Sequence, residues 1–123
     1  MPDSLHDLTA TIRKFADERD WEQFHSPKNL SMALIVEAGE LVEHFQWLSR
    51  KESGELDDEQ RRAVALEMAD VLIYLVRMAE RLDIDLLEAA RKKITLNAEK
   101  YPAGRSPSRA DKYTRYPKPA RDL

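Results

Sequence analysis

The chain has 123 residues, of which 42% are apolar and 35% charged, values that exclude a membrane-embedded or an intrinsically disordered protein. It contains no cysteine, so disulfides, thiolate metal sites and thiol nucleophiles are excluded, and three glycines are too few for a glycine-rich phosphate loop. The first residues lack the pattern of a secretory signal, and no apolar run reaches the roughly 20 residues that span a bilayer. We therefore expect a cytoplasmic protein with no membrane partner.

Charge is distributed unevenly around the net value of −3. Residues 102–123 carry six basic and two acidic side chains, a net +4, which leaves −7 on the rest of the chain. Such a tail could contact nucleic acid. A simpler explanation is that its positive charge attracts a small polyanion toward an acidic centre in the rest of the chain. No stable nucleic-acid partner is expected.

Two helices are predicted in the first half of the chain. The first covers about residues 5–24, with Ser4 as its N-cap. The second begins at Ser26-Pro27, a capping serine followed by proline at the first helical position, and continues to about residue 48. A polar stretch that contains Gly54 ends it.

Two further helices are predicted in the second half. The third begins at residue 57 or 58 and ends near residue 82, and the fourth covers about residues 85–101 with Asp83 as its cap. Four prolines make residues 102–123 an irregular basic tail. The pattern predicts an all-α protein, a four-helix bundle over residues 1–101 with antiparallel neighbours, followed by that tail.

Two acidic residues interrupt the apolar stripe of the second predicted helix. Glu37 occupies a position where the stripe requires an apolar residue, and Glu40 follows one turn later on the same face. Gly39 stands between them in the helix interior, which costs about 1 kcal/mol relative to alanine and indicates that another group approaches closely there.

The third predicted helix carries a second acidic pair. Residues 64–79 are apolar nearly all round, which predicts a buried helix, and their only acidic members are Glu67 and Asp70. A lone glutamate on an apolar stripe is usually paired or at an edge, but two such pairs on facing helices would repel one another. A divalent cation relieves that repulsion, and an all-oxygen set favours Mg²⁺ or Mn²⁺.

Other features bear on which chemistry the metal would serve. A di-iron bundle needs Glu-x-x-His from two helices, and this chain has that pattern once, at Glu22 and His25. Lys93, Asn97 and Lys100 form one polar, cationic stripe on the last predicted helix, suited to substrate phosphates, although a solvated helix face has the same appearance.

Three stretches together resemble a known family. They are WEQFHSPKNLSMALIVEAGELVEHFQW (21–47), LEMADVLIYLV (66–76) and KITLNAEKYP (93–102). They are similar to the MazG-like all-α nucleoside triphosphate pyrophosphatases, most of all to the dCTP pyrophosphatase branch. The resemblance covers about residues 5–114. One departure is Val36, where many MazG-like sequences have an extra glutamate.

The resemblance implies an enzyme that hydrolyses a nucleoside triphosphate to the monophosphate and pyrophosphate with Mg²⁺, and that forms homodimers or homotetramers. It implies three groups of site residues: metal ligands at Glu37, Glu40, Glu67 and Asp70; phosphate contacts at Lys93, Asn97, Lys100 and Tyr101; and base contacts at Trp21, His25, Trp47 and Tyr74. Lys112 and Tyr113 match the end of the dCTP branch with looser spacing.

The residues by themselves leave some of these roles open. Trp47 could stack on a base or anchor an interface, Trp21 could serve helix packing, and His25 could donate to a ligand or to a backbone carbonyl. We expect one of the two second-helix glutamates, Glu37 or Glu40, to be the catalytic base. The predicted substrate is dCTP or a related or modified nucleotide, and the alternative is a non-catalytic helical interaction module with a structural divalent ion.

Overall fold

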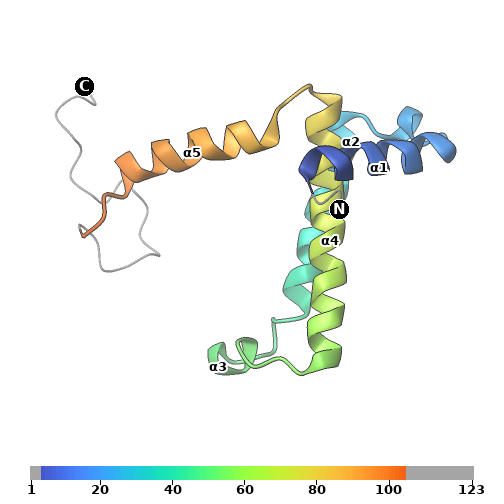
Figure 1. Cartoon of the computed structure of the whole chain (residues 1–123). Coiled ribbons are helices and arrows are strands. Elements are labelled where there is room, and N and C mark those ends of the chain that lie inside the picture. Colours follow the sequence, from blue (N-terminus) through green and yellow to red (C-terminus); the bar gives the residue numbers. More distant parts are fainter. Residues whose placement is uncertain (1–3, 105–123) are drawn as a thin grey trace. The chain divides into compact units, whose positions relative to one another are not determined.

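The computed structural model describes residues 4–104, and all regular secondary structure in that range is helical, with no strand (Figure 1). The predicted all-α fold class is confirmed. None of the described helices combines the length and the apolar character that a bilayer crossing requires. The predicted basic tail lies mostly outside the described residues, as do Lys112 and Tyr113. The helices are α1 (Leu5–Glu18), a 3-10 helix η1 (Glu22–Phe24), α2 (Pro27–Glu43), α3 (Arg50–Ser53), α4 (Asp58–Arg81) and α5 (Leu86–Lys100).

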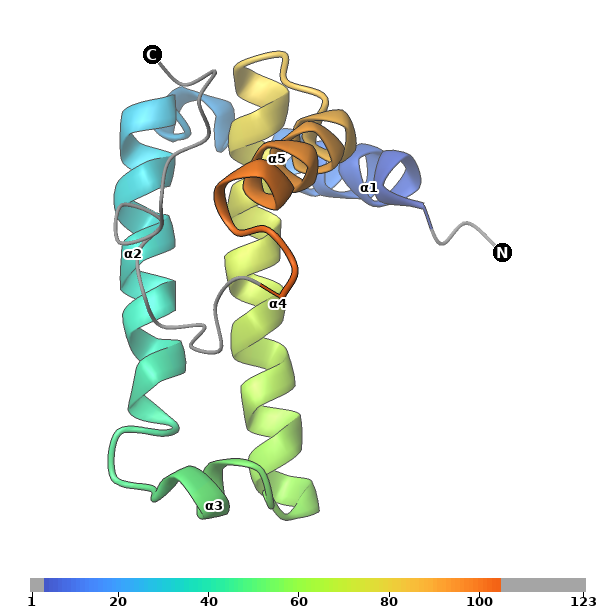
Figure 2. The ribbon, with the colours of Figure 1, turned by 90° about the vertical axis from the view of Figure 1, so that its left-hand side faces the viewer.

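The chain divides into two compact units, Met1–Ile84 and Asp85–Leu123. In the first unit α2 and α4 pack along each other and α1 packs on α4. Figure 2 shows that α2 and α4 run antiparallel, as predicted for the two helices that carry the acidic pairs. The described part of the second unit consists of α5 and the residues at its two ends.

The predicted helix starts agree with the caps in the structure. The Ser4 and Ser26 hydroxyls each accept a hydrogen bond from the backbone N–H three residues on, at 3.1 Å. Asp57 does the same for α4, accepting from the Gln60 N–H at 2.7 Å. Each cap satisfies a backbone donor that the first helical turn leaves unpaired, which fixes where the helix begins.

Helix α1 ends at Glu18, so the prediction that it continues to residue 24 is wrong. Asp20 adopts a left-handed conformation with φ of 54°. The Asp20 N–H donates to the Asp17 carbonyl at 3.1 Å, and the Trp21 N–H donates to the Ala16 carbonyl at 3.0 Å. These two bonds form a Schellman motif, which satisfies the last carbonyls of the helix and turns the chain away.

The same motif ends α4, where Asp83 has φ of 55° and the Ile84 N–H donates to the Ala79 carbonyl at 2.8 Å. The prediction that Asp83 caps the last helix is therefore wrong. Asp85 is the N-cap of α5, and its carboxylate accepts from the Glu88 N–H at 3.0 Å. Aspartate tolerates the left-handed region better than most residues, which explains how α4 can end without a glycine.

Helix α2 also ends earlier than predicted, at Glu43 instead of residue 48, and turns follow it. Within the polar stretch that was expected to close it, Ser49 begins the short helix α3. Ser49 and Glu52 form a reciprocal capping box, with bonds of 2.8 and 3.1 Å. The Ser-x-x-Glu spacing is the sequence signal that the prediction missed.

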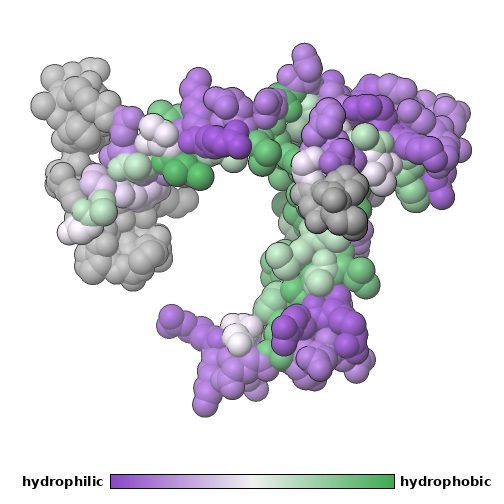
Figure 3. Space-filling view, in the orientation of Figure 1, coloured by the Kyte–Doolittle hydropathy of each residue, from purple (hydrophilic) through white to green (hydrophobic). Residues whose placement is uncertain are grey.

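Few side chains in the described range are buried. The apolar ones are Ile12, Ala16, Leu30, Val64, Val76 and Ala79. The prediction that residues 64–79 are buried all round is wrong for a single chain, because Leu66 is 70% and Met68 56% exposed. Figure 3 shows apolar side chains at the surface along the middle of the α2–α4 pair, since two neighbouring helices cover only part of the circumference of α4.

No other group of the described chain approaches Gly39. A Cβ built on it meets nothing within 4 Å, so the close approach predicted from the sequence does not come from this fold. We expect Gly39→Ala to raise the free energy of unfolding by about 0.5–1 kcal/mol, because alanine loses less backbone entropy in a helix. Urea denaturation followed by circular dichroism measures this change. A destabilised variant would show that a second chain or a ligand approaches Gly39.

Candidate functional site

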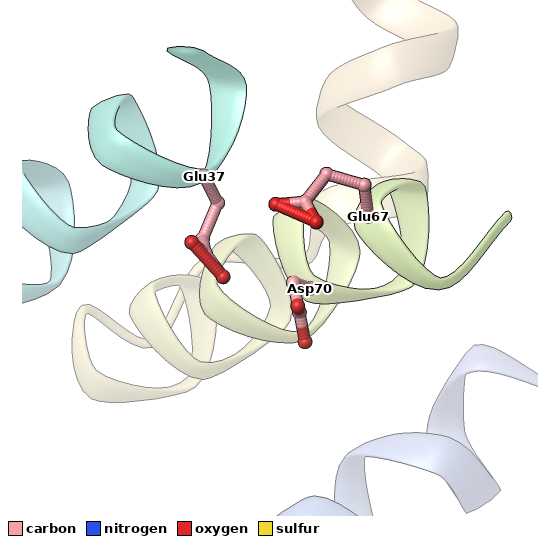
Figure 4. Close-up of side chains that lie close together, drawn as sticks. All are labelled: Glu37, Glu67 and Asp70. Atoms are coloured by element: carbon pink, nitrogen blue, oxygen red, sulfur yellow. The ribbon is translucent and has the colours of Figure 1, made fainter. Parts of the chain in front are cut away.

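Three carboxylates of the first unit meet between α2 and α4. Glu37 projects from α2 toward α4, where Glu67 and Asp70 are one helical turn apart (Figure 4). One carboxylate oxygen from each lies within 4.8 Å of the others. The antiparallel packing of α2 on α4 therefore brings together acidic residues that are 30 or more positions apart in the sequence.

The proximity of these carboxylates changes their acidity. The pKa of Glu67 is raised from 4.5 to about 7, mainly by hydrogen bonding with the neighbouring Glu40 carboxyl, then by burial and by the charges of Glu40, Glu37 and Asp70. The pKa of Glu37 is also raised, by burial first and then by Glu40 and Asp70. Without a counter-charge, the cluster favours protonation of one of its members.

The donor set fits a hard divalent cation. All its atoms are carboxylate oxygens, which suit Mg²⁺ or Mn²⁺ better than zinc. The Glu67 Oε1 atom is buried and has no hydrogen-bond partner within residues 4–104, although a buried polar atom is normally paired. A cation among the three carboxylates would satisfy that atom and remove the mutual repulsion.

Glu40 stands beside this group of three. Its carboxyl influences both Glu67 and Glu37, and its side chain is exposed on the next turn of α2. The structure thus brings Glu37, Glu67 and Asp70 together with Glu40 as their neighbour, and the assignment of all four as metal ligands stays a prediction.

A pocket of about 430 Å³ opens next to the acidic cluster, and Asp70 belongs to the lining of this pocket. The other walls come from α1, from the segment before α2 and from α4. Three aromatic rings of the pocket neighbour one another. The His25 ring centroid is 5.6 Å from that of Trp21 and 6.4 Å from that of Tyr74. Three of the four predicted base contacts therefore share one pocket of the size that holds a small organic ligand.

Trp47, the fourth predicted base contact, lies away from this pocket. It follows α2, whereas Trp21 precedes it, and the 17 residues of α2 span about 25 Å. Its side chain is 87% exposed. Trp47 does not join the other three aromatic residues within one chain, and its role stays a prediction.

The chain is similar to several known proteins. Residues 32–115 match the model of the MazG-like family. The chain is 46% identical over 116 residues to human dCTP pyrophosphatase 1, covering 93% of this chain and 68% of that one, and 45% identical over 117 residues to the mouse protein, covering 94% and 69%. It belongs to the MazG-like family. A crystal structure of a pyrophosphatase from Archaeoglobus fulgidus matches with a TM-score of 0.75 at 39% identity, over 79% of this chain and 91% of that one.

The predicted resemblance is confirmed, and with it the predicted class of this MazG-like chain, a nucleoside triphosphate pyrophosphohydrolase. The comparisons disfavour the alternative of a non-catalytic interaction module. The di-iron alternative also loses support, because Glu22 pairs with Arg81 at 2.5 Å and His25 accepts from Arg77 at 3.3 Å. Neither Glu22 nor His25 belongs to the acidic cluster.

Four predicted phosphate contacts of the MazG-like chain lie at the C-terminal side of α5. Lys93, Asn97 and Lys100 recur at helical spacing, and Tyr101 caps the helix by donating its backbone N–H to the Asn97 carbonyl at 2.8 Å. They all belong to the second compact unit. Their contact with a substrate stays a prediction.

Two of the pocket residues that were not predicted as site residues bear on its chemistry. Phe15 packs edge-on against Trp21, with ring centroids 5.4 Å apart, and its place on the apolar stripe of α1 was the available signal. Arg77 is 3% exposed and lines the pocket. Its signal was a basic residue inside an otherwise apolar helical run.

Proposed function

We propose that this MazG-like chain hydrolyses dCTP, or a related or modified deoxynucleotide, to the monophosphate and pyrophosphate in a reaction that requires Mg²⁺ or Mn²⁺. The observation that carries the proposal is that Asp70 belongs both to the acidic cluster and to the aromatic pocket. A nucleotide whose base occupies the pocket would have its phosphates near the carboxylates. The relatives named dCTP pyrophosphatase 1 support a cytosine nucleotide as substrate.

Glu37, Glu40, Glu67 and Asp70 would hold the metal. Bound there, Mg²⁺ would neutralise the triphosphate and stabilise the charge that develops on the leaving pyrophosphate. As the oxygen of the attacking water bonds to phosphorus and the bond from phosphorus to the leaving pyrophosphate breaks, a carboxylate oxygen of Glu37 or Glu40 would accept the proton of that water.

Aromatic residues would hold the base. Trp21, His25 and Tyr74 present ring surfaces in a pocket that is largely apolar, where stacking on a nucleobase contributes about 1–3 kcal/mol. Lys93, Asn97, Lys100 and Tyr101 would contact the phosphates, since lysine ammonium groups stabilise phosphate charge.

We further propose that the active form is a homodimer or homotetramer in the cytoplasm, built from the helical domain at residues 1–101, with the tail at 102–123 adding positive charge. The exposure of large apolar side chains supports self-association. Leu66 is 70% exposed, Ile35 is 68% exposed and Trp47 is 87% exposed. A second copy would cover such apolar side chains, and at an interface Trp47 could reach a neighbouring pocket.

The test is pyrophosphate release from a panel of ribonucleoside and deoxynucleoside triphosphates, with Mg²⁺ and with EDTA. We expect metal-dependent release that is fastest with a cytosine or modified-cytosine deoxynucleotide. Faster release from another base would discard the proposed substrate and keep the reaction. Saturable nucleotide binding with no release from any triphosphate would overturn the reaction itself.

A further inference from the structure

Arg77 makes an unusual set of contacts for a buried side chain. Its Nη1 donates to Glu80 Oε1 at 2.9 Å, and its Nε donates to the Nδ1 atom of His25 at 3.3 Å. Its Nη2 is buried and has no partner in the part of the chain that the structure describes. An arginine that served only to pair with Glu80 would not need to contact the histidine ring.

The contact with Arg77 determines which ring nitrogen of His25 carries the proton. A guanidinium group remains protonated in proteins and can only donate hydrogen bonds, so His25 Nδ1 must be the acceptor. A neutral imidazole then has its proton on Nε2. The pKa of His25 is lowered by burial first and then by the charges of Arg77 and Arg81, which favours the neutral ring.

This tautomer matters because both residues line the pocket beside Trp21 and Tyr74. The Nε2 atom of His25 has no hydrogen-bond partner among residues 4–104. Its N–H group is therefore a donor available to a ligand. A pocket that supplies a fixed donor favours a ligand with an acceptor and disfavours a similar ligand without one, because the donor would then stay unpaired.

We propose that Arg77 is a positioning residue that holds His25 as an Nε2–H donor, so that the pocket selects a nucleobase whose edge carries a hydrogen-bond acceptor. The inference rests on the proposed function in one respect, that the pocket receives the base.

The test measures equilibrium binding, which does not depend on turnover. By calorimetry, the full chain is titrated with dCMP and with the monophosphate whose base is difluorotoluene, a pyrimidine isostere without strong acceptors. In Arg77→Met we expect dCMP affinity to fall about five- to tenfold, the value of one hydrogen bond, and isostere affinity to change less than twofold. An equal loss for both ligands, or no loss for dCMP, would overturn the proposal.

Two control variants separate positioning from structure. Arg81→Met removes a nearby charge that does not bond to the ring, and Glu80→Gln removes the ion pair of Arg77 but leaves its Nε–H. Both should keep the preference for dCMP over the isostere. If Glu80→Gln lost that preference to the same extent as Arg77→Met, Arg77 would be only a structural anchor.

A spectroscopic measurement keeps the proposal testable even if Arg77→Met does not fold. The chain has three histidines, so nitrogen-15 spectra of the imidazole rings can be assigned. In the wild-type chain at pH 7.5 we expect His25 with unprotonated Nδ1 and protonated Nε2. A protonated Nδ1 would overturn the proposal.

The binding tests are independent of the proposed reaction. If both binding results are as expected but no triphosphate releases pyrophosphate, only the proposed reaction is contradicted.

Discussion

Replacing Asp70 by asparagine is expected to lower the rate of metal-dependent pyrophosphate release by about 10³-fold, because metal ions contribute several kcal/mol to transition-state stabilisation. Asp70 belongs to the acidic cluster and also lines the aromatic pocket. Its side chain is exposed, so the substitution should leave folding intact. Steady-state kinetics, circular dichroism and calorimetric Mg²⁺ titration together measure the effect.

Asp58 offers a matched control on the same helix. It lies in the first turn of α4, far from the cluster in sequence, and its carboxylate is 3.8 Å from Arg61 at the surface. Asp58→Asn should keep the wild-type rate, since exposed ion pairs contribute little. Near-wild-type turnover in Asp70→Asn would remove this residue from the proposed metal site.

The second large effect concerns pH. In the metal-free chain the pKa of Glu67 is about 7, so at lower pH a proton occupies the group that a cation would need. We expect Mg²⁺ affinity to fall by up to about tenfold for each pH unit below 7, and proton release on metal binding near pH 7. Calorimetric titrations in buffers of different ionisation enthalpy measure both quantities. Mg²⁺ affinity that is constant from pH 5 to 8 would contradict the raised pKa.

The same shift has a consequence for stability, with a definite sign. A carboxyl whose pKa rises from 4.5 to about 7 on folding binds more protons in the native state, so it favours folding below pH 4.5 and loses that contribution as pH rises to 7. With EDTA present, the melting temperature should therefore fall as the pH rises from 4.5 to 7 because of this group. Adding Mg²⁺ at pH 7.5 should raise the melting temperature again.

Glu67→Gln isolates this contribution. Glutamine is neutral at every pH in this range, so the variant should lose that part of the pH dependence and melt at a higher temperature than the wild type at pH 7.5 in EDTA. Mg²⁺ should also raise the melting temperature of the variant less than that of the wild type. Thermal melts of both proteins across the pH range, with Glu43→Gln as a control on the exposed face of α2, measure the difference.

The sequence determined the local features of this protein, because local hydrogen bonds decide them. Ser4, Ser26 and Asp57 each supply a side-chain acceptor for a first-turn N–H, so three helix starts were predictable from residues three positions apart. The acidic pairs were equally visible, since Glu67 and Asp70 stand one turn apart in an apolar run. Helix ends were less predictable, because Asp20 and Asp83 took the left-handed positions where glycine is the usual signal.

Only the tertiary structure decided which of these features meet. The distance between Glu37 and the pair on α4 depends on how two helices pack, and the shift in the pKa of Glu67 follows from that packing. The link between Arg77 and His25 joins residues 52 positions apart, and no local pattern contains it. Conversely, the apolar run around Leu66 looked like a buried helix, but one chain has too few neighbouring elements to cover it.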